Sequence, residues 1–143
     1  MVAHPKRKKA VFIDAKGLPT WEEGKHYGAP EPAREAERLA LLHSLRVLDS
    51  GSEDAFDRIT GLAAKLFDVP MALVSLIDAD RQYFKSRQGL AAPETSRDTA
   101  FCAYAVLPDA PDVFVVLDAS KDRRFMFNPL VTGPPDLRFY AGT

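Results

Sequence analysis

The chain has 143 residues, of which 46% are hydrophobic and 27% are charged, and these values are typical of one globular domain. The net charge of -1 argues against a surface that binds nucleic acid, so we expect no nucleic-acid partner. A single cysteine excludes an internal disulfide and a zinc finger, and no apolar run reaches the ~18 residues that would span a membrane.

Residues 1–30 are predicted to form a flexible basic leader. They carry six Lys/Arg against three Asp/Glu, and the basic excess lies mostly in residues 6–9. The remainder of the segment is rich in Gly and Pro without a sustained period, which favours a loop or disorder. The alternative for the basic cluster is a localisation signal or a nucleic-acid contact. Because the leader lacks the apolar core of a secretory signal, we expect a cytoplasmic protein.

Two amphipathic helices are predicted after residue 30. The first carries apolar residues at helical spacing, namely Leu39, Leu42, Leu45 and Leu48. The second carries an apolar stripe of Phe56, Ile59, Ala63 and Leu66. Ser50 and Glu53 have the spacing of a capping box, and the residue before Pro70 resists helical geometry, so the second helix is expected between these points.

The chain then changes to the period of β-strands. Residues 71–77 are apolar on both alternating faces, which predicts a central strand covered on both sides. Residues 82–89 are more polar and are predicted as the outer strand of a hairpin, followed by a polar loop over 91–99. Further strands are predicted at 113–119 and 136–142, with a short helix or turn between them. Helices followed by hairpin-like strands indicate an α+β domain built on an antiparallel sheet.

Several motifs in this order resemble GAF domains of the bacterial sensory class. They are "LVSLID" at 73–78, "RQYFK" at 81–85, "AFCA" at 100–103 and "RFYAG" at 138–142, together with "DRRFMFNPLV" at 122–131. The resemblance covers about 33–142, nearly all of the chain after the leader. It implies a GAF domain over 31–143, with a central antiparallel sheet and the N-terminal helices packed on it.

The resemblance also implies a function. GAF domains serve as sensory or regulatory modules for small-molecule sensing or dimerisation in signal transduction, and no output domain is evident in this chain. We therefore expect a non-enzymatic module with a small-molecule ligand and a homodimer formed through the N-terminal helix. The alternatives are a GAF-type methionine sulfoxide reductase, which would want several cooperating cysteines, and a purely structural dimerisation module.

The resemblance implies that the domain is C-terminally incomplete. Family members continue past the "RFYAG" motif with a strand that lies beside the first strand of the sheet. If that strand is absent, residues 72–77 lack a hydrogen-bonding neighbour, and each unsatisfied backbone group costs of order 1–3 kcal/mol. An exposed edge of this kind invites pairing with another chain.

Nine residues are candidates for ligand binding. The aromatic and sulfur-containing candidates would line a pocket, the arginines suit an anionic group, and the acidic and amide side chains would shape a lid. These residues are Phe84, Phe101, Cys102, Asp118, Arg124, Phe125, Asn128, Arg138 and Tyr140. For the charged candidates the alternative is ordinary surface charge, and for Asn128 it is an ordinary turn.

Cys102 is expected to be a small packed or pocket-lining side chain. The alternatives are redox sensing and covalent attachment of a cofactor. A bilin is not supported, because phytochrome-type GAF domains typically have a histidine after the attached cysteine, whereas Ala103 and Tyr104 follow here. The cyclic-nucleotide signature of GAF domains is not visible either. No metal-ligand spacing and no set of nucleophile, base and orienting group is present, so we expect no metal and no catalytic residues.

Overall fold

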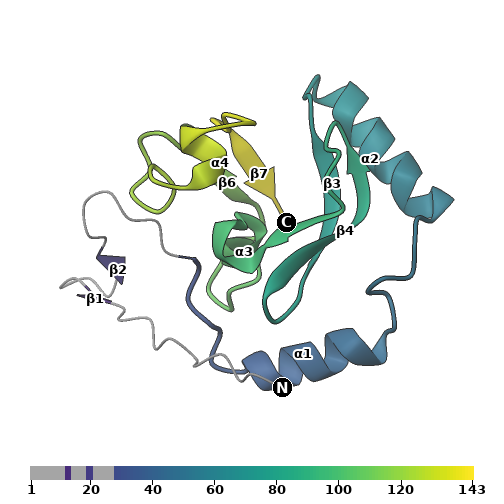
Figure 1. Ribbon diagram of the computed structural model, residues 1–143, viewed down its shortest axis with the longest axis horizontal. Coiled ribbons are helices and arrows are strands. Elements are labelled where there is room, and N and C mark those ends of the chain that lie inside the picture. Colours follow the sequence, from purple (N-terminus) through teal and green to yellow (C-terminus); the bar gives the residue numbers. More distant parts are fainter. Residues whose placement is uncertain (1–11, 14–18, 21–27) are drawn as a thin grey trace, which may run out of the picture.

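The computed structural model describes residues 12–13, 19–20 and 28–143 (Figure 1). Phe12–Ile13 (β1) and Pro19–Thr20 (β2) pair as two short antiparallel strands. The flexible basic leader predicted over residues 1–30 therefore lies almost entirely outside the described residues. The structure places the folded body in residues 28–143.

The order of elements confirms the α+β class (Figure 1). Two helices come first, and strands and short helices then alternate. The elements are α1 (Glu35–Ser44), α2 (Asp54–Leu66), β3 (Ala72–Ile77), β4 (Arg81–Gln88), β5 (Glu94–Ser96), a 3-10 turn η1 (Arg97–Thr99), α3 (Cys102–Ala105), β6 (Phe114–Val116), α4 (Pro129–Thr132) and β7 (Tyr140–Gly142).

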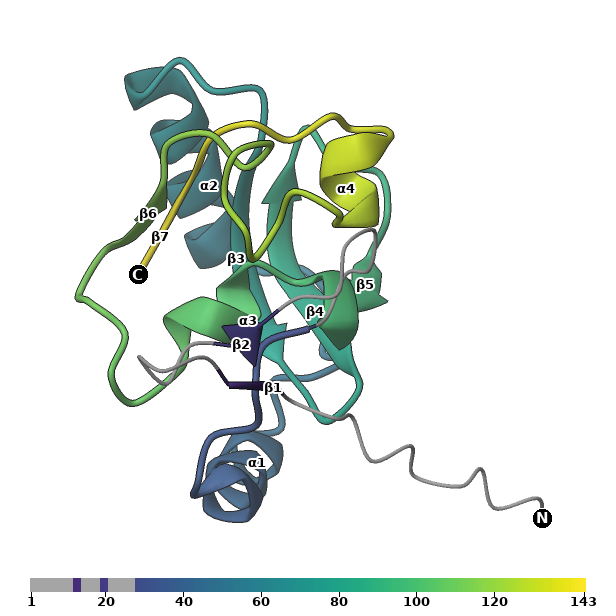
Figure 2. The ribbon, with the colours of Figure 1, turned by 90° about the vertical axis from the view of Figure 1, so that its left-hand side faces the viewer.

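The described strands of the body form two antiparallel sheets rather than one. The larger sheet has the order β3-β4-β5, and the smaller one pairs β6 with β7. Figures 1 and 2 show the smaller sheet on the β3 side of the larger one. The prediction that residues 71–77 form a central strand and residues 82–89 an outer strand is wrong for this sheet. The short strand β5, which lies within the predicted polar loop, pairs with β4 and makes β4 the middle strand.

A β-bulge in β4 determines how α2 is held. Val74 pairs with Ser86 and Ser75 pairs with Phe84, so Lys85 is an extra residue in the ladder. Ser86 Oγ lies 2.8 Å from Thr60 Oγ1 of α2 and donates a hydrogen bond to Asp57 Oδ1 at 2.5 Å. The buried contact between α2 and the sheet is therefore partly polar.

The Lys85 ammonium also replaces the predicted capping box. It lies 2.5 Å from Glu53 Oε1 and donates to Ser50 Oγ at 2.6 Å and to the Gly51 carbonyl at 2.8 Å. Glu53 is the N-cap residue of α2, but its side chain makes no capping hydrogen bond. The capping prediction is wrong because a buried ammonium competes for both side chains and needs several acceptors.

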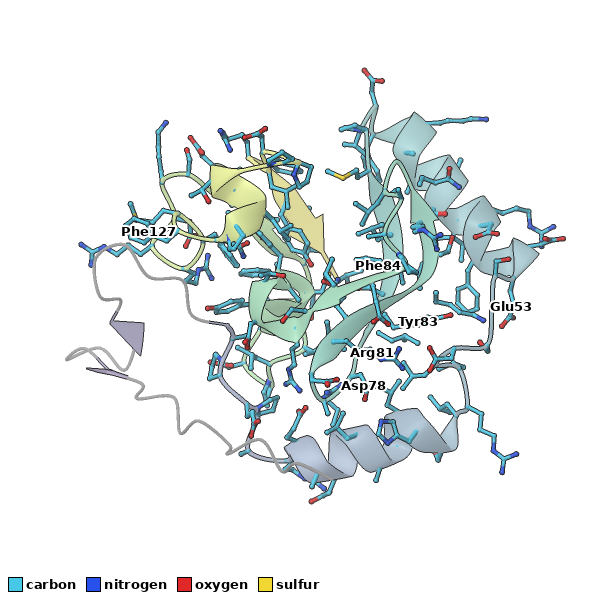
Figure 3. All side chains as sticks on the ribbon, viewed as in Figure 1. Glu53, Asp78, Arg81, Tyr83, Phe84 and Phe127 are labelled. Carbon is cyan, nitrogen blue, oxygen red and sulfur yellow. The ribbon has the colours of Figure 1, made fainter. Side chains whose placement is uncertain are left out.

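The α1 helix is attached through charges rather than through its leucines. Arg97 Nη1 lies 2.5 Å from Glu35 Oε1, and His43 Nε2 lies 2.7 Å from Asp78 Oδ1. Leu42 is the only α1 residue that is buried. Figure 3 shows Asp78 and Arg81 on the end of the hairpin that faces α1. The expectation that both N-terminal helices pack on the sheet thus holds for α2 only.

We expect the Glu35 carboxylate to make the stability of the fold depend on pH. Hydrogen bonds from Arg38 and Arg97 lower the pKa of Glu35 from 4.5 to about 2, against the opposing effect of burial. A lowered folded-state pKa stabilises the protein above pH 4.5, and this contribution is lost as the pH falls through 2. Glu35→Gln should therefore lower the free energy of unfolding by of order 1–3 kcal/mol at pH 6, and by less than half that value at pH 3.

Urea unfolding at the two pH values measures this difference. Glu37→Gln is the matched control, because Glu37 pairs with Arg34 on an exposed part of the same helix. Exposed pairs contribute about 0–1 kcal/mol, so the control should change little at either pH. An equal loss at pH 6 and pH 3 for Glu35→Gln would contradict the argument.

Candidate functional site

An aromatic cluster joins α3 to the smaller sheet. The rings of Phe101 and Phe125 stack with centroids 4.0 Å apart, and the Tyr140 ring lies 5.3 Å from Phe101. Tyr104 meets Phe125 edge-on at 5.0 Å. Phe114 of β6 completes the set at 6.2 Å from Tyr104. Phe125 is fully buried at the centre of this cluster.

Arg124 covers the outer side of the cluster. Its guanidinium carbon lies 4.8 Å from the centre of the Phe114 ring, with the Phe125 and Tyr104 rings at 5.3 Å and 5.8 Å. Its Nε and Nη2 groups donate to the two carboxylate oxygens of Asp122 at 2.9 Å and 2.5 Å. These hydrogen bonds raise the pKa of Arg124, so a permanent positive charge is held against the aromatic rings.

A cavity of about 390 Å³ opens beside this guanidinium, and we call it the Arg124 pocket. Its volume is within the range of small-molecule sites. Most of its wall is apolar, and two carboxylates and one guanidinium add charge. The lining residues are Pro30, Glu31, Pro32, Ala33, Tyr104, Leu107, Pro108, Asp109, Ala110, Pro111, Phe114 and Arg124.

Tyr104 contributes a buried hydroxyl to this region. Within the described part of the chain its oxygen has no hydrogen-bond partner. Burial raises the pKa of Tyr104, so the phenol stays protonated. An unpaired buried polar group costs about 1–3 kcal/mol, so a bound molecule that supplies a partner after a small shift of the ring would gain that energy.

Cys102 is the first residue of α3 and is partly buried. Its sulfur accepts a hydrogen bond from the Tyr140 hydroxyl at 3.2 Å, and the side chain packs against the small cluster that contains Ile77 and Ala103. Burial and the neighbouring Cys102 raise the pKa of Tyr140. These contacts are those of a packed side chain behind the aromatic cluster.

Five of the nine predicted site residues come together in space. They belong to the aromatic cluster or contact it, and they are Phe101, Cys102, Arg124, Phe125 and Tyr140. Asn128 lies directly behind Phe125, because its backbone N–H donates to the Phe125 carbonyl at 2.7 Å. Its side chain is fully buried and donates to the Thr99 carbonyl at 3.0 Å.

The other three predicted residues lie elsewhere. Asp118 accepts hydrogen bonds from Ser120 in a local turn, and these bonds lower its pKa to about 2. Arg138 donates to the Val131 carbonyl at 3.0 Å, which ties the chain before β7 to α4. Phe84 is buried in β4 and belongs to the larger sheet.

Sequence reasoning missed most of the pocket wall. Tyr104 and Phe114 are aromatic residues that border the predicted site, and their ring type was the available signal. The Pro30–Ala33 and Leu107–Pro111 segments carry no periodic signal, because they are irregular and meet only through the fold.

A second cavity of about 320 Å³ lies between the start of α2 and β4. Tyr83, Lys85 and Ser86 line it, together with Asp57. Figure 3 shows Glu53 and Tyr83 on the side of β4 that α2 covers. Because Glu53 already neutralises the Lys85 ammonium, this cavity offers less free charge to a ligand than the Arg124 pocket.

The described residues contain no group of three or more His, Cys, Asp or Glu side chains placed to hold a metal ion. None of their helices has both the length and the apolar character needed to cross a membrane.

The fold and the pocket define a class: an α+β domain with a ligand-sized cavity beside an aromatic core. No family model matches the chain. The chain is 42% identical, over 113 residues, to the cyclic di-GMP phosphodiesterase PA2567 of Pseudomonas aeruginosa. The match covers 79% of this chain and 19% of that protein, so the chain spans about a fifth of the length of the relative.

This relative corrects one expectation and supports another. The expectation that the chain is not an enzyme is overturned, because the protein it resembles is named as an enzyme, although only 19% of that protein is matched. The broader expectation of a role in signal transduction agrees with the match. The GAF resemblance itself stays a prediction.

Proposed function

We propose that this chain is a GAF-type sensory domain that controls cyclic di-GMP turnover in response to a small molecule in the Arg124 pocket. The match to a cyclic di-GMP phosphodiesterase supports the signalling context. The observation that carries the proposal is the pocket itself, in which a guanidinium, held against three rings, meets an apolar cavity. That combination suits an aromatic molecule with one anionic group.

Asp122 leaves part of the guanidinium for such a ligand. It accepts hydrogen bonds from Nε and Nη2, and no described residue accepts one from Nη1. An aromatic carboxylate would place its ring among the prolines and Leu107, and its negative charge beside Nη1. The carboxylates of Glu31 and Asp109 disfavour ligands with more than one negative charge in this pocket.

Arg124→Gln should weaken the binding of benzoate, the simplest such probe. We expect benzoate to raise the melting temperature of the purified chain by several degrees at saturation, since a ligand at 100 times its Kd stabilises a protein by about 2.7 kcal/mol. Arg124→Gln should weaken the affinity at least tenfold, about 1.4 kcal/mol, in a benzoate titration. Arg123→Gln is the matched control, because Arg123 is exposed and does not line the pocket.

A chimera tests the signalling part. The matched segment of the Pseudomonas aeruginosa relative would be replaced by this chain, and hydrolysis of cyclic di-GMP would be followed with and without benzoate. We expect the rate to change with benzoate in the chimera and not in its Arg124→Gln form. If benzoate bound without changing the rate of hydrolysis, the pocket would still be a ligand-binding site, but the regulatory role would be contradicted. No binding of any aromatic anion would contradict the sensory role.

A further inference from the structure

The segment that precedes α1 forms one wall of the Arg124 pocket. Residues 30–33 line the cavity, and the remainder of its wall lies between Tyr104 and Arg124 in the chain. Figures 1 and 2 both show the segment before α1 passing beside α3 on its way to that helix. We call residues 28–35 the strap, because they cross the pocket from one side.

Both ends of the strap are held by the same short turn, η1. At the beginning of the strap, Gly28 lies so close to η1 that a Cβ added there would come within 2.9 Å of the Asp98 Cα. At the other end, Glu35 Oε1 lies 2.5 Å from Arg97 Nη1. Two neighbouring residues of η1 therefore fix the ends of a segment whose middle lines the pocket.

Arg97 is a firm anchor because the hairpin between β3 and β4 holds it. Its Nη1 donates to the Asp78 carbonyl at 3.0 Å, and its backbone N–H donates to the Asp80 carbonyl at 3.0 Å. The side chains of Arg97 and Glu35 are only 9% and 11% exposed. An ion pair so far from water keeps most of its electrostatic strength, and removal of one partner leaves the other uncompensated.

Little apolar contact opposes the release of the strap from η1. Ala29 is the strap residue that packs against both apolar clusters, and its side chain is small. Leu42 is the one buried residue of α1. The contact between His43 and Asp78 is at the far end of this helix. The position of the pocket wall therefore depends strongly on the pair that Glu35 forms.

We propose that the pair of Glu35 and Arg97 positions the pocket wall, so that closure of the strap on η1 and ligand binding in the Arg124 pocket strengthen each other. This inference rests on the proposed function, because the ligand is the aromatic anion assigned there to the pocket. Such a ligand contacts the strap only in its closed state, and it therefore binds that state more tightly than an open one. By linkage, the ligand stabilises the closed strap by the same factor. Glu35 and Arg97 are positioning residues, since neither lines the cavity.

Benzoate titrations of variants of the whole chain test the coupling from the side of the pocket. Glu35→Gln should weaken the affinity for benzoate by about fivefold or more, which is the lower end of typical coupling between two sites. Glu37→Gln is the matched control and should bind as the wild type does, because Glu37 forms an exposed pair with Arg34 on the same helix. Circular dichroism at the temperature of the titration verifies that each variant is folded. Wild-type affinity in folded Glu35→Gln would overturn the proposal.

The beginning of the strap offers a second variant, which leaves the ion pair untouched. Gly28→Ala adds a Cβ that would clash with the backbone of Asp98, so the strap must move away from η1. We expect a loss of benzoate affinity similar to that of Glu35→Gln. Gly61→Ala is the matched control, because a Cβ there would meet no neighbouring element within 4 Å. Equal affinities in the two alanine variants would contradict the role of the strap.

Amide hydrogen exchange measures the same coupling from the side of α1. Saturating benzoate should slow exchange in α1 of the wild type more than in α2, because the strap leads directly into α1 and α2 does not line the pocket. An equal effect on the two helices would be ordinary stabilisation of the whole domain by a ligand, and it would count against the coupling.

Exchange without ligand separates this inference from the proposed function. Gly28→Ala and Glu35→Gln should both speed exchange in α1 when no benzoate is present, whereas Gly61→Ala should leave it unchanged. If the wild type did not bind benzoate, the proposed function would fail, yet faster exchange in the first two variants would still support the strap as the part that holds α1 and the wall in place. Unchanged exchange in both of them would refute that role whether or not benzoate binds.

Discussion

Phe125→Ala should lower the free energy of unfolding by about 3–5 kcal/mol, which is a large part of the stability of a domain of this size. Phe125 is fully buried, and it touches the rings of Phe101, Tyr104 and Phe114. Truncation of this side chain removes the stabilisation that comes from burying a large ring. It also leaves a cavity, which the rigid aromatic neighbours cannot move to fill. Arg124 would also lose one of its three rings, so the Arg124 pocket should change shape.

Urea or thermal unfolding measures the loss, and Phe139→Ala is the control. Phe139 is 54% exposed and lies just before β7, so its truncation should cost less than ~1 kcal/mol. Comparable losses for the two variants would show that the aromatic cluster is not the main core of this half of the domain. Phe125→Leu should recover much of the stability, because it refills most of the volume with apolar atoms.

The periodicity of the sequence was sufficient to find the main elements. The helical spacing of the leucines located α1, and the apolar run at 71–77 located β3. Local signals of this kind depend on one segment at a time, so they survive without knowledge of the rest of the fold. The strands predicted near the C-terminus were too long. For example, β7 covers only three residues of the run predicted at 136–142.

The direction in which a helix faces was harder to predict. The second apolar stripe was read as the buried face of α2, yet Ile59 and Leu66 face outward. The inward face is instead fixed by Thr60 and by the bulge that presents Ser86 to it. A bulge adds one residue to a ladder without a distinctive pattern in the chain, so the sequence offered no signal for it.

The site was predicted where its residues are close in sequence or share chemistry. Phe101, Cys102 and Phe125 came from motifs and do meet in the aromatic cluster. Asp118 and Arg138 were selected for their charge, but local turn and carbonyl contacts already use that charge. Whether a charged side chain is used within the fold depends on neighbours that the sequence alone does not place.

Asn128 differs from its prediction in a way that leads to the second large effect. It was proposed as part of a lid, yet its side chain is fully buried and joins two segments. Its Oδ1 accepts from the Leu130 N–H at 2.9 Å and caps α4, while its Nδ2 donates to the Thr99 carbonyl at 3.0 Å. An amide is needed here because the two contacts require one acceptor and one donor.

Asn128→Ala should therefore lower the free energy of unfolding by about 2–4 kcal/mol. Loss of the cap costs ~1 kcal/mol, and the Thr99 carbonyl left without its partner in the interior costs about 1–3 kcal/mol more. Asn128→Asp separates the two contributions, because it keeps the capping oxygen and replaces the donor with a second oxygen that faces the Thr99 carbonyl. We expect this variant to be destabilised at pH 7 and to recover part of its stability at pH 4–5, where a carboxyl whose pKa is raised by burial becomes protonated and can donate.

The pH dependence of the stability of Asn128→Asp distinguishes a structural role of Asn128 inside the domain from a role in a lid. If Asn128 acts only through the cap, Asn128→Asp would be as stable as the wild type at pH 7, and its stability would not rise toward acidic pH relative to the wild type. A loop that opens over a ligand would give a different result again, with both variants near wild-type stability and altered binding of benzoate. We expect neither, because the side chain has no exposed surface and its hydrogen bonds with Leu130 and Thr99 join α4 to η1 behind the aromatic cluster.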